Sequence, residues 1–146
     1  MSSLCFPSAL PRRSDSLKRI DVKGKVFSGK GEGAEFIKLP WVKTQISERL
    51  GFVPYSGTLN IKLIGEGVKI KKLLKKAKSM KISPAKGFCR GRCFKAFLME
   101  NLECAVVIPE IANYPENVIE VIASVNLRRE LQLEDGNMVE VKILLQ

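Results

Sequence analysis

The segment LGFVPYSGTLNIKL, residues 50–63, passes from a turn into a strand. Two glycines and a proline supply the bends, because proline fixes one backbone angle and glycine allows sharp turns. From residue 58 onward apolar and polar side chains alternate, which predicts a strand with one buried face and one polar face. The polar face presents a hydroxyl, an amide and an ammonium in a row, from Thr58, Asn60 and Lys62.

Thr58 and Asn60 carry neutral oxygen atoms on the same face of this predicted strand. Hydroxyl and amide oxygens are hard ligands that suit Mg²⁺, which takes much of its shell from water and phosphate groups. The alternative is an ordinary strand whose polar face is half exposed to solvent. The segment by itself leaves both interpretations open.

Length and composition indicate one soluble globular domain. The 146 residues can build a sizeable core, and 45% hydrophobic with 27% charged residues is typical of such domains. No apolar run is long enough to span a bilayer, and residues 1–10 lack the pattern of a signal peptide. We therefore expect a cytoplasmic protein without membrane contacts.

The charge and the side-chain inventory restrict the chemistry. A net charge of +10 and a sequence pI of about 9.6 favour a polyanionic partner, either a nucleic acid or a nucleotide. The absence of histidine excludes Ser-His and Cys-His nucleophilic pairs and histidine metal sites. The cysteines lack a second pair that would complete a zinc site, so we expect reduced structural thiols at Cys5, Cys89, Cys93 and Cys104.

The predicted elements form a folded region at 18–146 behind a flexible N-terminal tail at 1–17, where serines and prolines show no periodicity. A helix is expected over 40–50, and a short one over 126–131 with Asn126 as its cap. Trp41 should pack against the domain, with stacking on a base or a flavin as the alternative. Strands are expected at 20–27, 58–63, 81–83, 93–99, 104–108, 118–123 and 138–144. Several short strands with few helices favour a small closed barrel.

The segment SGKGEGA, residues 28–34, places three glycines at alternate positions after the first predicted strand. Such a loop allows a backbone to approach phosphate oxygens and to aim N–H groups at them. It is neither a Walker A loop nor the dinucleotide-binding motif, because the spacing differs from both. A flexible hairpin loop without a ligand is the equally open alternative.

Residues 68–81 are rich in lysine, with apolar residues at helical spacing between the charges. The pattern predicts an amphipathic helix with a solvated basic face, and nucleic-acid binding is the alternative. We expect surface charges that contribute little to any active site. The lysines of this segment are Lys69, Lys71, Lys72, Lys75, Lys76, Lys78 and Lys81.

Four motifs together resemble the archaeal CTP-dependent riboflavin kinases, in order and spacing from about residue 22 to residue 143. They are GKGEG at 29–33, LGFVPYSGTLN at 50–60, VIEVIA at 118–123 with Leu127 and Arg128, and LEDG at 133–136. The second of these motifs is specific, whereas the glycine loop alone is not.

The resemblance implies a mainly β fold, a small six-stranded cradle-loop barrel of Greek-key type with one or two short helices. It implies an enzyme that transfers the γ-phosphate of CTP to the ribityl 5′-hydroxyl of riboflavin, giving FMN and CDP. Mg²⁺ or another divalent cation would be required. We expect a monomer with riboflavin and CTP as partners, without nucleic acid or membrane.

The resemblance also implies roles for individual residues. Thr58 and Asn60 would bind the metal ion, and Glu120 would contact the flavin together with Ala112 and Asn113. The family has a threonine where this chain has Ala112, so that hydroxyl contact is lost or supplied by a neighbour. The general base is unknown, with Glu120 as its candidate. Nucleotide binding would involve Gly29, Lys30, Gly31, Glu32, Gly33, Ala34, Val125, Asn126, Leu127 and Arg128.

Two other functions compete with a kinase. A basic barrel that binds nucleic acid would explain the charge, but only 7% of the residues are aromatic and no stacking platform is evident. A flavin carrier without turnover would need neither a phosphate loop nor a metal site. Phosphoryl transfer relies mainly on positioning and charge neutralisation, so a chain without histidine can perform it.

Overall fold

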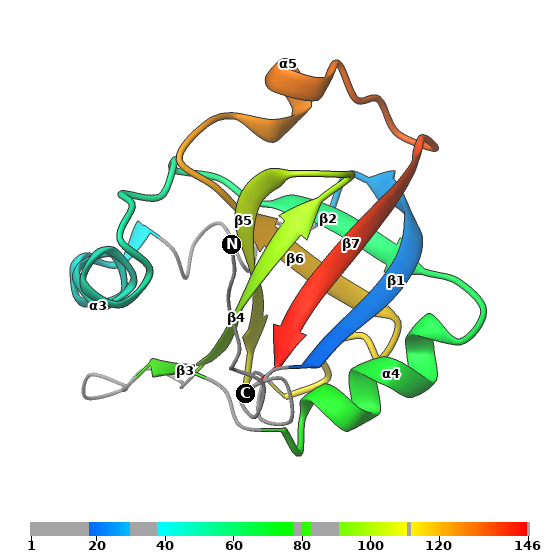
Figure 1. Cartoon of the computed structure of the whole chain (residues 1–146), viewed down its shortest axis with the longest axis horizontal. Coiled ribbons are helices and arrows are strands. Elements are labelled where there is room, and N and C mark those ends of the chain that lie inside the picture. Colours follow the sequence, from blue (N-terminus) through cyan, green and yellow to red (C-terminus); the bar gives the residue numbers. More distant parts are fainter. Residues whose placement is uncertain (1–17, 30–37, 78–79, 83–90, 111, 146) are drawn as a thin grey trace, which may run out of the picture.

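Antiparallel strands dominate the structure, a computed structural model that describes residues 18–29, 38–77, 80–82, 91–110 and 112–145 (Figure 1). This part of the chain contains seven strands and three helices. In chain order they are β1 (Lys18–Phe27), α3 (Pro40–Leu50), β2 (Leu59–Leu63), α4 (Gly67–Leu74), β3 (Met80–Ile82), β4 (Gly91–Leu98), β5 (Leu102–Pro109), β6 (Val118–Ile122), α5 (Leu127–Leu131) and β7 (Met138–Leu145).

Six of the strands close into a barrel. The strand order is β3-β4-β5-β6-β2-β1-β7, and a further pairing between β4 and β7 closes the ring of six strands from β4 to β7. All pairings are antiparallel, and β3 extends the sheet beside the first residues of β4. The predicted six-stranded barrel is confirmed, with three helices among the described residues where one or two were expected.

The alternating patterns determine which side of each strand faces the barrel interior. Leu59, Ile61 and Leu63 of β2 are buried and belong to the interior core, whereas Lys62 between them is exposed. β1 and β7 follow the same rule with their valine and isoleucine residues. Burial of these apolar faces is the main favourable term in closing such a barrel.

Helices cover three sides of the barrel (Figure 1). α4 lies at one end and contributes Leu74 to the interior core, and α5 lies at the other end and contributes Leu127. α3 packs Val42, Ile46 and Leu50 against the outer face of β4, β5 and β6, which forms a second apolar cluster. The predicted helix over 40–50 is confirmed, and it stops at Gly51, whose φ of 82° suits glycine.

β6 is buried along its whole length, because the barrel core covers one face and other elements cover the opposite face. Ile119 and Val121 face the interior, and Ile122 packs into the α3 cluster. Glu120 therefore occupies a buried position on the outer face. It is the charged side chain in an otherwise apolar strand.

Two cysteines bear on the thiol prediction. Cys93 and Cys104 are buried and free, and burial raises the pKa of each thiol to about 12. Such thiols are unreactive, which agrees with a structural role. Trp41 packs against the α3 cluster, as expected. Cys5, Cys89 and the predicted tail at 1–17 lie outside the described residues.

No helix in the described part of the chain is long and apolar enough to cross a membrane.

Candidate active site

Glu120 is the centre of the candidate site. Its side chain is 2% exposed, and in the β2–β6 pairing it lies directly opposite Asn60. Thr58 Oγ1 donates a hydrogen bond to Glu120 Oε1 at 2.6 Å, and the hydroxyl of Tyr114 donates to Oε2 at 2.6 Å. Two short hydrogen bonds to a buried carboxyl group fix its orientation. Glu120 thus joins Thr58, next to the start of β2, to the loop between β5 and β6.

A cavity of about 180 Å³ lies on the Thr58 side of this carboxyl group. It is lined by Tyr55, Thr58 and the segment 125–128, among other residues. Asn126 donates from Nδ2 to the Tyr55 hydroxyl at 3.2 Å, and its side-chain oxygen accepts from the Arg129 backbone N–H at the start of α5. All four predicted nucleotide-binding residues of the second segment therefore meet at one cavity.

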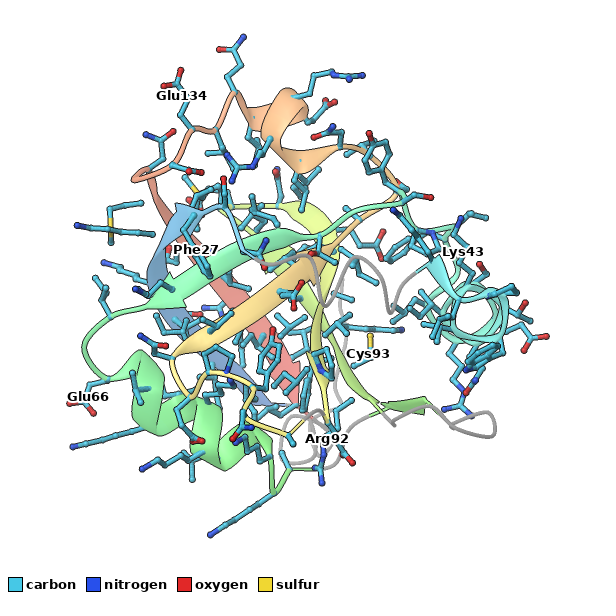
Figure 2. All side chains as sticks on the ribbon, turned by 180° about the vertical axis from the view of Figure 1, so that it is seen from behind. Phe27, Lys43, Glu66, Arg92, Cys93 and Glu134 are labelled. Atoms are coloured by element: carbon cyan, nitrogen blue, oxygen red, sulfur yellow. The ribbon has the colours of Figure 1, made fainter. Side chains whose placement is uncertain are left out.

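A second, larger cavity of about 660 Å³ lies on the Tyr114 side. Ala112, Asn113 and Tyr114 line it together with two ion pairs at its rim. Arg92 pairs with Glu110 at 3.0 Å, at the end of the barrel that α4 covers (Figure 2). The other pair joins Lys75 to Glu116 at 3.0 Å. Both predicted flavin residues of the β5–β6 loop line this cavity, and Glu120 reaches its wall through Tyr114.

The side chains of Thr58 and Asn60 carry neutral oxygen atoms of the kind that Mg²⁺ accepts as ligands. Thr58 donates its hydroxyl hydrogen bond to Glu120, which leaves the oxygen lone pairs available. Asn60 lies beside Gly29: a methyl group at Gly29 would be 2.7 Å from Asn60 Oδ1. No cluster of three acidic or cysteine side chains that could hold a metal ion occurs among the described residues. A metal ion at Thr58 and Asn60 would therefore rely on neutral oxygens, water and phosphates.

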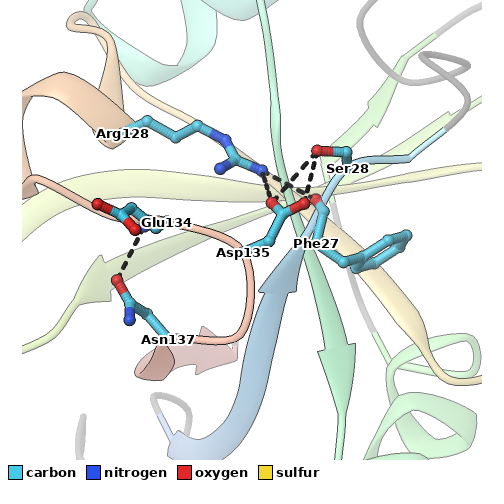
Figure 3. A network of polar contacts seen from close by, with 6 residues as sticks. All are labelled: Phe27, Ser28, Arg128, Glu134, Asp135 and Asn137. Carbon is cyan, nitrogen blue, oxygen red and sulfur yellow. Dashed lines mark hydrogen bonds and ion pairs between the residues drawn. The ribbon is translucent and has the colours of Figure 1, made fainter.

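The start of the glycine loop is held by a polar network (Figure 3). Arg128 donates from Nη2 to the backbone oxygen of Phe27 at 3.1 Å and to Asp135 Oδ1 at 2.7 Å. Ser28 Oγ donates to Asp135 Oδ2 at 2.9 Å. The Arg128 guanidinium and then the Ser28 hydroxyl lower the pKa of Asp135 below its ordinary value. This network ties Phe27 directly, and Ser28 through Asp135, to Arg128, whereas Lys30 to Ala34 lie outside the described residues.

A family model covers most of this region. Residues 26–143 match CTP-dep_RFKase, described as a domain of unknown function, DUF120. The chain belongs to this family.

Curated relatives extend the comparison. Proteins named riboflavin kinase are 42% identical in Pyrobaculum aerophilum, 38% in Archaeoglobus fulgidus and 34% in Methanosarcina barkeri. The alignments cover 89%, 86% and 91% of this chain, and 63%, 55% and 60% of the relatives. This chain therefore spans about six tenths of the length of the curated relatives it matches.

One lysine departs from the prediction for the basic segment. The helix expected over 68–81 ends at Leu74, and Lys71 is 1% exposed rather than solvated. Its ammonium group donates to the Pro115 backbone oxygen at 2.6 Å and lies 4.7 Å from the centre of the Tyr114 ring. The prediction of a solvated basic face is wrong for Lys71, because this residue shares the buried side of α4 with Gly67 and Leu74.

Burial lowers the pKa of Lys71 from 10.5 to about 8, and the nearby charge of Lys75 adds to the effect. Between these pH values the folded protein has released the Lys71 proton while the unfolded chain retains it, so stability should rise with pH. We expect the unfolding free energy of the wild type, relative to Lys71→Met, to increase by up to roughly 3 kcal/mol across this window, at about 1.4 kcal/mol per pKa unit.

Urea unfolding of both proteins at several pH values measures this difference, and the titrating groups that the two proteins share cancel in it. A difference that stays constant with pH would contradict the assignment of a depressed pKa to Lys71.

Sequence reasoning assigned no role to Tyr55, Lys71 or Tyr114. Tyr55 belongs to the LGFVPYSGTLN motif, and its position there was the available signal. Lys71 lies four residues after Gly67 and three before Leu74, which places it on the buried stripe of a helix. Tyr114 gave no periodic signal because it lies in a loop, and only the fold shows that its hydroxyl reaches Glu120.

Proposed function

We propose that this protein is a riboflavin kinase that transfers the γ-phosphate of CTP to the 5′-hydroxyl of the ribityl chain, giving FMN and CDP. The observation that carries the proposal is the Glu120 carboxyl group, which accepts hydrogen bonds from Thr58 on one side and Tyr114 on the other. Each hydroxyl group borders a different cavity, so one residue connects two ligand sites. The curated relatives are named riboflavin kinase, which supports the kinase activity, and the name of the family model supports CTP as the donor.

The smaller cavity is proposed as part of the nucleotide site. The 125–128 segment would contact the cytidine, and residues 29–34 would direct backbone N–H groups to the phosphates. The hydrogen bonds of Arg128 to Phe27 and Asp135 hold the 125–128 segment against the end of β1, just before this loop. Such preorganisation reduces the ordering cost of binding.

Thr58 and Asn60 are proposed as the metal ligands. A divalent cation bound there would neutralise phosphate charge and help to orient the γ-phosphate. Glu120 would hold Thr58 in the correct rotamer by accepting its hydrogen bond, so that the lone pairs point away from the carboxyl group.

The larger cavity is proposed as the riboflavin site. Ala112 cannot offer the hydroxyl group that the family supplies at this position, and Asn113 or Tyr114 beside it carries the polar atoms that line the cavity here. The ribityl 5′-oxygen would attack the γ-phosphorus, the bond to the bridging oxygen of CDP would break, and the hydroxyl proton would leave. Glu120 is the candidate to accept that proton.

The nucleotide requirement tests the proposal directly. The protein is incubated with riboflavin, Mg²⁺ and each of the four nucleoside triphosphates, and FMN is measured by chromatography. We expect CTP to support faster FMN formation than ATP, because a mismatched base edge leaves buried polar groups unpaired, at about 1–3 kcal/mol each.

Each alternative outcome identifies a different function. Equal rates with ATP would contradict the CTP assignment and leave a kinase. Riboflavin binding without FMN formation would indicate a carrier. Absence of riboflavin binding, together with salt-sensitive binding to RNA or DNA, would favour the basic nucleic-acid module.

A further inference from the structure

We propose that Lys71 is a positioning residue for riboflavin: it holds the Tyr114 ring, and through it the Glu120 carboxyl group, in the arrangement that receives the flavin. This inference rests on the proposed function, because it assigns a role within the proposed riboflavin site. The contacts of Lys71 with the β5–β6 loop carry it.

Lys71 lies on α4, at the end of the barrel opposite α5 (Figure 1). Within the described part of the chain its hydrogen bond and ring contact go to Pro115 and Tyr114, and it does not line the smaller cavity. An almost fully buried ammonium group is costly, so proteins pair it with specific partners. Here the partners are the Pro115 carbonyl and the face of the Tyr114 ring, both in the loop that borders the larger cavity.

The geometry forms a short chain of contacts from α4 to β6. The Lys71 ammonium fixes the Tyr114 ring from one side, and the Tyr114 hydroxyl donates to Glu120 Oε2 at 2.6 Å. Asn113, which precedes Tyr114, has a φ of 64°, a backbone conformation that needs support from its surroundings. Lys71 supplies such support by binding the carbonyl of Pro115, two residues further along.

The charged and titratable groups around Lys71 come from three elements. Lys75 follows it by one turn on α4, Glu116 and Tyr114 belong to the β5–β6 loop, and Glu120 belongs to β6. Lys75 disfavours the Lys71 charge, whereas the carboxyl groups of Glu116 and Glu120 favour it. The ring contact with Tyr114 requires a protonated Lys71, since a neutral amine gives no cation–π attraction.

The test compares Lys71→Met, Tyr114→Phe and the double variant, with Lys72→Met on the exposed face of α4 as the matched control. Riboflavin dissociation constants come from quenching of flavin fluorescence without nucleotide, and KM for CTP and kcat come from FMN formation. We expect Lys71→Met to weaken riboflavin binding about tenfold, through loss of a charged hydrogen bond and a ring contact. KM for CTP in the Lys71→Met protein should stay within about twofold of wild type. In the Lys72→Met control, the riboflavin dissociation constant and KM for CTP should both stay within that range.

Because Lys71 acts through Tyr114, the effects of the two single variants should not add, and the double variant should resemble the weaker-binding single variant. A merely structural role would raise the riboflavin dissociation constant and KM for CTP together. Unchanged riboflavin binding in a folded Lys71→Met protein would overturn this inference and leave the proposed function standing. Fully additive effects of the two single variants on riboflavin binding would do the same. Failure of the wild type to bind riboflavin would overturn the proposed function and the inference with it.

A measurement on proteins that retain Lys71 covers the case in which Lys71→Met does not fold. The wild-type riboflavin dissociation constant should rise about threefold between pH 7 and 9 as the ring contact loses its charge. Tyr114→Leu, which lacks the ring, should show no such step. An equal rise of the riboflavin dissociation constant between these pH values in both proteins would overturn the inference.

Discussion

Thr58→Val and Asn60→Leu should each lower the rate of FMN formation by on the order of 10²-fold or more, because metal ligands neutralise and orient the phosphates. Both substitutions keep the size of the side chain and remove its oxygen. Neither should unfold the barrel, since both side chains lie on the outer face of the strand and are only partly buried. FMN formation at saturating riboflavin and CTP, with circular dichroism to verify folding, measures the effect.

The two variants differ in what else they disturb. Thr58→Val also removes a hydrogen-bond donor from Glu120, so riboflavin binding should weaken in that protein. Asn60 faces Glu120 across the strand pair and is not among the described residues that line the larger cavity, so Asn60→Leu should bind riboflavin normally. Thr58→Ser retains the hydroxyl and should retain activity. Lys62→Met, on the exposed side of the same strand, is the matched control.

Near-normal FMN formation by both Thr58→Val and Asn60→Leu, with Mg²⁺ still required, would place the metal elsewhere. That result would also remove the main support for the proposed mechanism. A second readout, the Mg²⁺ concentration for half-maximal rate in Thr58→Ser and wild type, reports on the metal site without loss of the hydroxyl.

Glu120→Gln should lower kcat/KM for riboflavin by about 10²-fold. The carboxyl group accepts two hydroxyl donors at 2.6 Å each, and an amide of the same shape has one oxygen to accept with. One hydroxyl group would then face an N–H₂ group. The loss of a buried charge-assisted hydrogen bond alone costs about 1.5–3 kcal/mol, and loss of a proton acceptor would add to it.

The division of the Glu120→Gln effect between kcat and KM distinguishes its two possible roles. A fall in kcat with unchanged riboflavin affinity would indicate a proton acceptor. A rise in KM that matches the riboflavin dissociation constant, with unchanged kcat, would indicate a flavin anchor. Glu110→Gln, at the rim of the larger cavity, provides a comparison in which an ion pair is lost without contact to Glu120. Full activity of Glu120→Gln would remove Glu120 from the site.

Local patterns predicted most of the fold. The period of two in residues 59–63 and the period of four in residues 42–50 depend on neighbouring side chains alone, and both elements formed where expected. Asp-Gly at 135–136 is a dipeptide typical of turns, and Gly136 there has a φ of 96°. Asn126 was predicted as a helix cap and accepts from the Arg129 backbone N–H. Capping and turn formation are short-range effects, so a sequence pattern suffices to predict them.

The candidate site was predictable only in part. The strand pattern placed Thr58 and Asn60 on one face. The resemblance to a known family assigned site roles to Glu120 and residues 125–128, further along the chain. Their convergence at neighbouring cavities depends on the pairing of β2 with β6, which joins residues about 60 positions apart in the chain. A sequence pattern does not specify such a register, because many pairings satisfy the same alternation.

The sequence by itself therefore determined the elements, the barrel class and the candidate ligands on β2, because these follow from local periodicity and side-chain chemistry. Only the tertiary structure decided which charged groups are buried and which partners they contact. Lys71 resembles its neighbours Lys72 and Lys75 in the sequence, yet α4 turns it toward the β5–β6 loop and away from water. Glu120 became the link between two cavities because barrel closure placed Thr58 and Tyr114 on either side of it. The free energy of a charged group depends on what surrounds it in space, and distant segments supply those surroundings.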